Sequence, residues 1–219
     1  MTIQENIREV LATLPTGVRL VAVSKFHPVE ALQEAYDGGQ RIFGESKVQE
    51  MTAKHEQLPA DIEWHFIGHL QSNKIKYIAP FIHLIHSIDT FKLLQEVDKQ
   101  GAKTGRRIPC LLQIHIAQEE SKFGFTPQEC MEMLEEGQWR SLQNVEIRGL
   151  MCMASNTEDK EQIASEFSTV QRLFKVIKER FFTGNESFSI LSAGMSDDYP
   201  IAIEHGSTHI RIGSGIFIE

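Results

Sequence analysis

Short runs of apolar residues, each followed by a stretch with helical spacing, recur along the whole chain. Eight of these runs predict β-strands, at Val18–Ser24, Arg41–Gly44, Glu63–Ile67, His83–Ile88, Cys110–Ile116, Val145–Met151, Phe188–Leu191 and His209–Ile212. Helices are predicted between them, at Val29–Asp37, Lys47–Gln57, Ser72–Ile78, Phe91–Lys103, Pro127–Glu136, Glu158–Phe181 and Asp197–Glu204. Apolar residues three or four apart within these stretches support the helical assignment. One more helix, Ile3–Leu14, is predicted before the first strand.

Strands that alternate with helices favour parallel pairing with right-handed crossovers. Eight such units with short loops predict an α/β fold, a closed (β/α)₈ TIM barrel with an extra N-terminal helix, as one domain over residues 1–219. An open doubly wound sheet is the alternative. Neither a GxGxxG nor a GxxxxGK[ST] sequence follows the first strand, which argues against a nucleotide-binding sheet.

Composition narrows the classes of partner. The net charge is −8, from 22 basic and 30 acidic residues, which argues against a nucleic-acid or anionic membrane surface. Three cysteines without a CxxC pair predict neither disulfides nor a thiolate metal site. The N-terminal residues do not resemble a signal peptide, and no apolar run approaches the roughly 20 residues that span a bilayer. We therefore expect a cytoplasmic protein. A monomer is expected because no predicted helix has two apolar faces that would require a partner.

Ligands of such a barrel bind at the carboxyl ends of its strands, and Lys25 follows the first strand there. A lysine that is partly desolvated at the barrel mouth has a nucleophilic amine that attacks carbonyl groups. The alternative is a lysine that extends into solvent, which position alone favours.

Two turns rich in glycine and serine follow the seventh and eighth strands, at Gly194–Ser196 and Gly213–Gly215. The corresponding loops of TIM barrels commonly bind phosphate. Glycine allows backbone N–H groups to approach oxygen atoms, and the hydroxyls of Ser196 and Ser214 are donors. Turns of this kind also occur without a ligand, so both interpretations stay open.

Arg211 alternates with apolar residues in the last strand and is expected to face the barrel interior, where it needs an acceptor. A pyridine nitrogen and a carboxylate such as Glu45 are the two candidates. His65 and His69 are four residues apart, but no third ligand pattern accompanies them, so structural histidines are expected and no metal site. Asp197 and Asp198 are expected to begin a helix.

Several segments resemble one known family. They are Ala22–Lys25, Phe43–Glu45, Trp64–Lys74, Glu119–Phe125, Arg148–Met151, Gly194–Asp198 and Gly206–Gly213. Together they resemble the pyridoxal phosphate homeostasis protein family, also called proline synthetase co-transcribed homologue. The matches run in order through nearly the whole chain, and the segment Trp64–Lys74 is highly specific. The resemblance implies a barrel similar to the N-terminal domain of alanine racemase.

The resemblance also implies a cofactor, pyridoxal 5′-phosphate (PLP), held as a Schiff base on Lys25. It implies that Ser196, Gly213 and Ser214 hold the phosphate, with Met195 in the same turn, and that Arg211 faces the pyridine nitrogen. Two departures stand out. Ser46 replaces the usual asparagine after Gly-Glu, which puts that contact with the cofactor in doubt, and no glycine follows Ile216-Phe217.

A carrier of PLP is expected rather than a dedicated enzyme. An arginine opposite the pyridine nitrogen keeps that nitrogen unprotonated, which weakens the ring as an electron sink. Racemisation needs acid–base groups on both faces of the substrate, and none of Tyr36, Tyr77 and Tyr199 is obviously placed for this. The resemblance implies PLP homeostasis, with transfer to apo-enzymes as partners. The alternatives are a weak amino-acid racemase and a phosphate-sugar barrel enzyme without cofactor.

Overall fold

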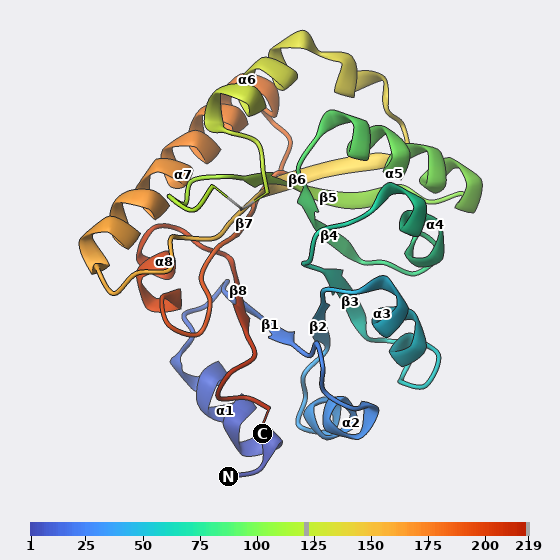
Figure 1. The fold of residues 1–219 in the computed structure, drawn as a ribbon, viewed down its shortest axis with the longest axis vertical. Coiled ribbons are helices and arrows are strands. Elements are labelled where there is room, and N and C mark those ends of the chain that lie inside the picture. The colour runs from blue at the N-terminus through green and yellow to red at the C-terminus, as the bar shows by residue number, and fades with distance from the viewer. Residues whose placement is uncertain (121–122, 218–219) are drawn as a thin grey trace.

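The structure, a computed structural model, describes residues 1–120 and 123–217. Its strands form a closed parallel barrel in the order β1 to β8, each paired with its neighbours in the sequence (Figure 1). The strands are β1 Arg19–Val23, β2 Ile42–Glu45, β3 Glu63–Phe66, β4 Leu84–Ile88, β5 Ile108–Ile114, β6 Val145–Cys152, β7 Ile190–Ser192 and β8 His209–Ile212. The predicted (β/α)₈ TIM barrel is confirmed, and the open doubly wound sheet is wrong.

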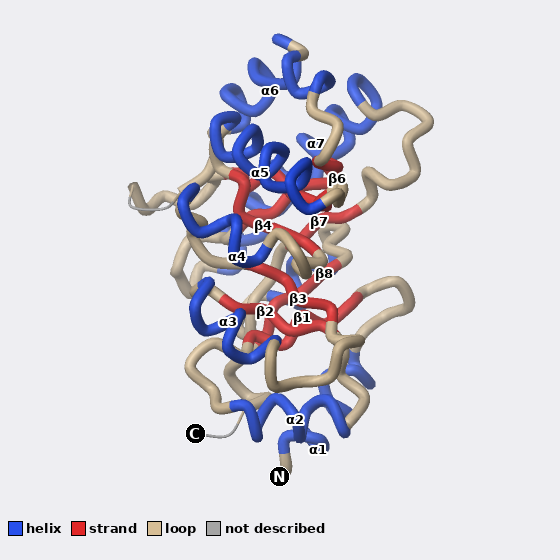
Figure 2. The backbone as a smooth tube through the Cα atoms, turned by 90° about the vertical axis from the view of Figure 1, so that its right-hand side faces the viewer, coloured by secondary structure: helices blue, strands red, loops and turns tan. Residues whose placement is uncertain are grey.

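Helices surround the strands on the outside of the barrel (Figure 2). They are α1 Ile3–Thr13, α2 Val29–Asp37, α3 Val48–His55, α4 Ile75–Ile78, α5 Phe91–Thr104, α6 Pro127–Glu136, α7 Lys160–Phe181 and α8 Tyr199–Glu204, with short 3₁₀ helices at Ser72–Lys74 and Gln138–Ser141. The extra N-terminal helix is thus present, as α1. No described helix, however, combines the length and apolar character that crossing a membrane requires.

Local sequence signals explain several helix ends. Thr2 and Glu5 form a capping box at the start of α1, and Thr126 and Glu129 form another at the start of α6. Gly105 ends α5 in the left-handed conformation, with φ of 65°, which glycine adopts without strain. These signals can be read locally, and the three ends lie within a residue or two of the predicted bounds.

Several predicted boundaries differ from the structure by a residue or two at either end, as at β5, α3 and α7, and three differences have a local explanation. The predicted helix over residues 72–78 divides into a 3₁₀ turn and the four-residue α4. Strand β7 comprises Ile190–Ser192 instead of Phe188–Leu191, because Phe188 packs against the rings of Phe174 and Phe182. Helix α8 begins at Tyr199 and not at Asp197.

Apolar packing lies between the barrel and its helices, around buried side chains such as Trp64, Phe43 and Phe167. Inside the barrel the side chains are unusually polar. His65, His86 and Arg211 are at most 3 % exposed and come from β3, β4 and β8. The barrel interior therefore combines these polar side chains with a small apolar cluster of Leu84, Leu111 and Met151.

The two ends of the described chain lie side by side (Figure 1). Asn6 of α1 donates a hydrogen bond from Nδ2 to the carbonyl oxygen of Ile216, at 3.0 Å. Helix α1 thus holds the segment that follows β8. The similar segment Glu119–Phe125 lies partly outside the described residues, as does the chain end after Phe217.

Candidate functional site

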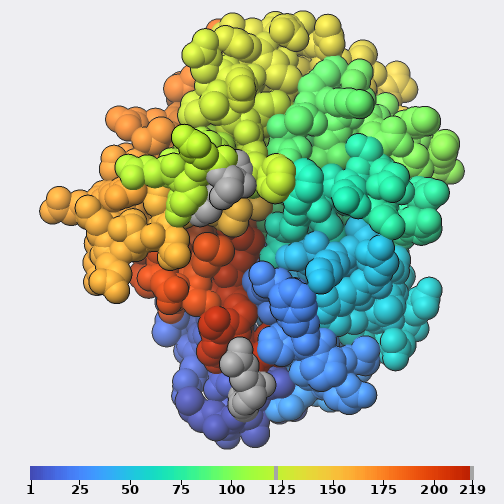
Figure 3. Space-filling view, in the orientation of Figure 1, coloured from blue at the N-terminus to red at the C-terminus, as the bar shows by residue number. Residues whose placement is uncertain are grey.

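One cavity of about 610 Å³ opens at the carboxyl ends of β1 and β8. Its lining consists of Val23, Lys25, Phe26, His27, Met195, Ser196, Asp197, Arg211, Gly213 and Ser214. These residues come from opposite ends of the sequence, and the space-filling view shows the C-terminal red segment against blue residues of the N-terminal part (Figure 3). The structure therefore brings together all but one of the predicted site residues.

Lys25 stands at the rim of this cavity. Its side chain is exposed. The expected partial desolvation of this lysine at the barrel mouth is therefore wrong. The reason is the turn that follows β1, where Phe26 adopts a left-handed φ of 69° and the chain leaves the barrel axis. Lys25 still lines the cavity, and Nζ lies 5.8 Å from the centre of the Phe26 ring.

A buried ion pair supports this turn from behind. Lys54 of α3 places Nζ 2.6 Å from Glu45 Oε1 and donates to the carbonyl oxygen of Ser24 at 2.8 Å. It also contacts Glu50 Oε1 at 2.8 Å, and that oxygen accepts the backbone N–H of Phe26. The backbone on both sides of Lys25 is thus tied to one buried lysine.

Glu45 belongs to this network and not to Arg211, so the predicted Arg211–Glu45 alternative is wrong. Ser24 donates a hydrogen bond to Glu45 Oε1 at 2.6 Å, while Oε2 is buried and has no hydrogen-bond partner among the described residues. Burial raises the pKa of Glu45 above its ordinary value, although Lys54 and Ser24 act in the opposite direction.

Replacing Lys54 by methionine is expected to destabilise the fold by about 3 kcal/mol, because Glu45 loses the cation that pairs with it in a buried position. The double variant Lys54→Met/Glu45→Gln removes the unpaired charge and should recover part of that loss. Urea unfolding of both variants checks this prediction. A single variant as stable as the wild type would show that the ion pair does not support the turn.

The two glycine–serine turns contact each other at the other side of the cavity. Ser196 donates from Oγ to the carbonyl oxygen of Ser214 at 3.4 Å. The carboxylate of Asp198 accepts the backbone N–H of Met195 at 2.6 Å. Asp198 is the residue that precedes α8, as expected, but its side chain makes no capping bond and instead stabilises the Met195–Ser196 turn.

Arg211 faces the barrel interior, as predicted, and also lines the cavity. Its guanidinium donates from Nη1 to Ser192 Oγ at 2.6 Å and from Nη2 to the carbonyl oxygen of Cys152 at 2.9 Å. Burial lowers the pKa of Arg211 from its ordinary value. The acceptors come from neighbouring strands β7 and β6, so the guanidinium is fixed in direction.

Ser192 begins a hydrogen-bonded chain that crosses the barrel interior. Ser192 Oγ lies 2.9 Å from His86 Nδ1, and His86 Nε2 lies 2.8 Å from His65 Nδ1. Burial lowers the pKa of both imidazoles well below the usual range, and neighbouring positive groups act in the same direction. Both histidines are therefore neutral at pH 7, and they connect Arg211 to the opposite end of the barrel.

Two predicted residues lie elsewhere. Ser46 lines a separate pocket of about 180 Å³ beside Lys47 and Phe66. His69 is exposed, contacts Asp89 at 3.3 Å and stacks on Phe123. His65, by contrast, is buried. The spacing of four residues between His65 and His69 therefore does not make a pair.

Sequence reasoning missed Lys54 and the chain through His86 and Ser192. Lys54 carries no signal in the sequence, because a lysine in an amphipathic helix usually faces solvent. His86 does carry a signal in the sequence, since it alternates with apolar residues in a strand as Arg211 does.

A second cavity of about 840 Å³ adjoins the first and shares Met195 and Asp197 with it.

A closed (β/α)₈ barrel with a lysine at the mouth of β1 and a glycine–serine turn after β8 defines an alanine-racemase-like barrel. The family described as alanine racemase, N-terminal domain, matches residues 1–219. The pyridoxal phosphate homeostasis protein of Helicobacter pylori (strain ATCC 700392 / 26695) is 40% identical over 206 residues, 92% of this chain and 88% of that protein. That of Vibrio alginolyticus is 38% identical, over 99% of this chain and 97% of that protein. The chain belongs to the pyridoxal phosphate homeostasis protein family.

Solved structures agree with this assignment. PipY of Synechococcus elongatus PCC7942 with PLP bound has a TM-score of 0.90 and 34% identity, and the match covers 99% of this chain and 100% of that one. Alanine racemase from E. faecalis has a TM-score of 0.74 at 18% identity, and only 57% of its chain is covered. The second likeness shows the fold alone.

Proposed function

We propose that residues 1–219 act as a single PLP-binding domain that holds the cofactor as a Schiff base on Lys25 and buffers it in the cytoplasm. The observation that carries this proposal is the composition of one cavity. An amine, two hydroxyls and a buried guanidinium line it together, on Lys25, Ser196, Ser214 and Arg211. The PLP-bound structure of PipY, a relative with the same fold, supports it.

Each group matches one part of PLP. The amine of Lys25 attacks the aldehyde carbon, a C=N bond forms, and the carbonyl oxygen leaves as water. The hydroxyls of Ser196 and Ser214 donate to the phosphate, and Gly213 and Met195 bring the backbone of both turns close to it. Arg211, which is buried in the lining of the same cavity, would face the pyridine nitrogen.

The same residues favour storage over catalysis. PLP supplies an electron sink whose strength depends on the protonation of its ring nitrogen. Arg211 donates hydrogen bonds to two acceptors and stays a cation, so it can donate a hydrogen bond to that nitrogen but does not transfer a proton to it. A racemase also needs a second acid–base group. The hydroxyl of Tyr36 is bonded to Asp61, Tyr77 lies on the surface of α4, and Tyr199, at the start of α8, packs against the apolar core.

Ser46, the remaining predicted cofactor contact, lines the separate pocket and not the cavity of Lys25. A serine is shorter than the asparagine that the family usually has there. We propose that the contact is lost or mediated by water in this protein, and that Lys25 and the two phosphate turns supply the binding.

The proposed function is tested by loading the protein with PLP and adding an apo-form of a PLP-dependent enzyme. We expect the enzyme to gain activity as the Schiff-base absorption of the loaded protein falls, with the protein acting as a monomer. In parallel, L-alanine and L-serine are incubated with the loaded protein in ²H₂O, and no deuterium should enter the α-position. Rapid racemisation that requires Lys25 would favour the weak racemase, and failure to bind PLP would favour the cofactor-free barrel enzyme.

A further inference from the structure

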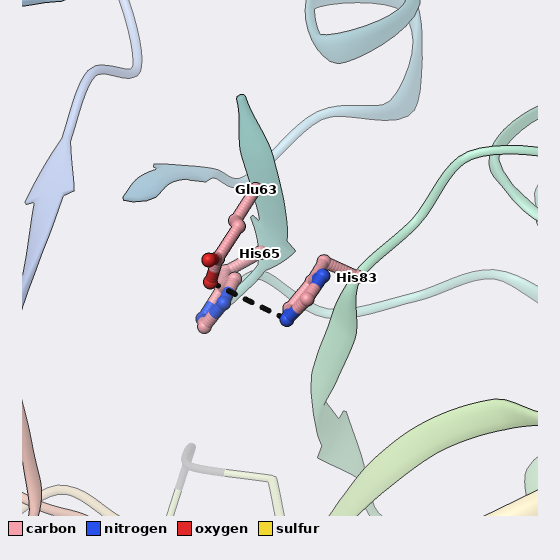
Figure 4. Close-up of side chains that lie close together, drawn as sticks. All are labelled: Glu63, His65 and His83. Carbon is pink, nitrogen blue, oxygen red and sulfur yellow. Dashed lines mark ion pairs between the residues drawn. The ribbon is translucent and has the colours of Figure 1, made fainter. Parts of the chain in front are cut away.

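A second cluster of ionisable groups lies at the amino ends of the strands, on the face opposite Lys25. Glu63 begins β3, His65 follows two residues later, and His83 precedes β4 (Figure 4). One ligand atom from each residue lies within 4.8 Å of the other two. His83 Nε2 contacts Glu63 Oε2 at 3.3 Å, the ion pair that is dashed in Figure 4.

His65 presents an unused ring nitrogen to this cluster. Its side chain is 1 % exposed, and its Nε2 is buried without a hydrogen-bond partner among residues 1–120 and 123–217. Buried polar atoms in folded proteins are almost always paired. His65 lines a pocket of about 230 Å³ together with His83, so the unpaired nitrogen borders a space that can hold an ion.

We propose that Glu63, His65 and His83 bind a divalent transition metal ion, with Zn²⁺ as the best match. Two imidazoles and one carboxylate are ligands that Zn²⁺ binds in proteins, with a water molecule in the remaining position. Mg²⁺ and Ca²⁺ prefer sites made of oxygen atoms. The sequence led to the opposite expectation because it suggested pairing His65 with His69, which the fold separates.

The surroundings of His65 suit a metal ligand. A ligating histidine usually donates its other ring N–H to a neighbouring acceptor, which fixes the ring orientation. His65 Nδ1 lies 2.8 Å from His86 Nε2, so a metal on Nε2 makes Nδ1 the donor and His86 the acceptor. His86 Nδ1 then donates to Ser192 Oγ, which also accepts from Arg211.

Two arginines border the pocket and suggest an anion as the competing ligand. Arg148 is engaged by Glu146 at 2.8 Å, but Arg19 binds the carboxylate of Glu63 at 3.1 Å. A metal ion must share this carboxylate with Arg19, whereas an anion would be attracted by Arg19. Removal of the arginine therefore changes the two affinities in opposite directions.

The test uses the PLP-loaded protein after treatment with a chelator, and titrates Zn²⁺ by isothermal calorimetry at pH 7.5. We expect one ion per chain. His83→Ala and Glu63→Gln should each weaken binding by more than about tenfold, because even the loss of a group behind a ligand weakens metal sites by about that much. His205→Ala, at the end of α8, is the matched control and should bind as the wild type does.

Arg19→Ala should bind Zn²⁺ more tightly than the wild type, since the competing cation is gone. Co²⁺ in the wild-type protein should give the weak visible bands of nitrogen and oxygen ligands without a thiolate charge-transfer band. Because this spectrum is measured on the wild-type protein, it tests the proposal even if a variant fails to fold. The proposal is overturned if no Zn²⁺ binds, if both ligand variants bind normally, or if Co²⁺ shows thiolate ligation by the three buried cysteines.

Discussion

Replacing Lys25 by alanine is expected to abolish the Schiff-base absorption of the PLP-loaded protein. PLP affinity should fall by on the order of a hundredfold, about 2.7 kcal/mol, because only the phosphate turns and Arg211 would hold the cofactor. Since the side chain of Lys25 is exposed, the fold should stay intact. Titration of PLP followed by absorption, with circular dichroism as a check of folding, measures both effects.

Lys47→Ala is the matched control for this prediction. Lys47 is also exposed, and its Nζ lies 5.1 Å from the Phe26 ring, close to the 5.8 Å of Lys25. Lys47 does not line the cavity, so its removal should leave the absorption unchanged. The assignment of Lys25 is wrong if its variant keeps the band while the Lys47 variant loses it.

The stability of the protein is expected to fall steeply in mild acid because of the histidines inside the barrel. Burial lowers the pKa of His65 and His86 well below the usual range and that of His209 to about 4. In the unfolded chain each imidazole takes up a proton near pH 6.5. Below this pH the unfolded state therefore binds more protons than the folded state. The contribution of these groups to the free energy of unfolding is complete above pH 6.5 and is lost as the pH falls.

Each neutral buried histidine gives a slope of up to about 1.4 kcal/mol per pH unit, so the three together give up to about 4 kcal/mol per unit below about pH 6. Glu45 and Asp89 act in the opposite direction, because burial raises the pKa of both carboxyl groups and this favours folding at low pH. Urea unfolding at pH 7.5, 6.5 and 5.5, with a chelator present, measures the slope.

A His86→Gln variant should reduce this slope by up to about 1.4 kcal/mol per pH unit, because one titrating group is removed from the interior. Glutamine keeps a donor and an acceptor for His65 and Ser192, so the fold should be retained. A slope that is already flat in the wild type, or that His86→Gln leaves unchanged, would contradict the assignment of neutral imidazoles to the barrel interior.

The sequence could predict the barrel because alternation of strand and helix is a local signal repeated along the chain. It could also group Lys25, Ser196, Arg211 and Ser214, since all follow or end strands whose carboxyl ends meet at one mouth. An exposed Lys25 side chain was the alternative that position alone favoured, but the direction of that side chain along the rim of the cavity was not predictable. It depends on the left-handed turn at Phe26, and aromatic residues rarely adopt that conformation.

Contacts between distant elements account for what the sequence did not reveal. The sequence alone suggests that Lys54 is a surface lysine. In the fold, α3 packs against the barrel, and Lys54 is buried in an ion pair with Glu45. His65 and His83 are 18 positions apart in the sequence, and only the pairing of β3 with β4 brings them together. Such contacts depend on the closed barrel, and the spacing of residues along one sequence does not predict them.

The most direct measurement of the central claim is reduction of the PLP-loaded protein with borohydride, followed by digestion and mass spectrometry. Reduction converts the Schiff base to a stable secondary amine, so the modified lysine carries the cofactor through digestion. The account predicts one pyridoxyl group per chain, on the peptide that contains Lys25. A group on another lysine, or no modified peptide from a protein saturated with PLP, would contradict it.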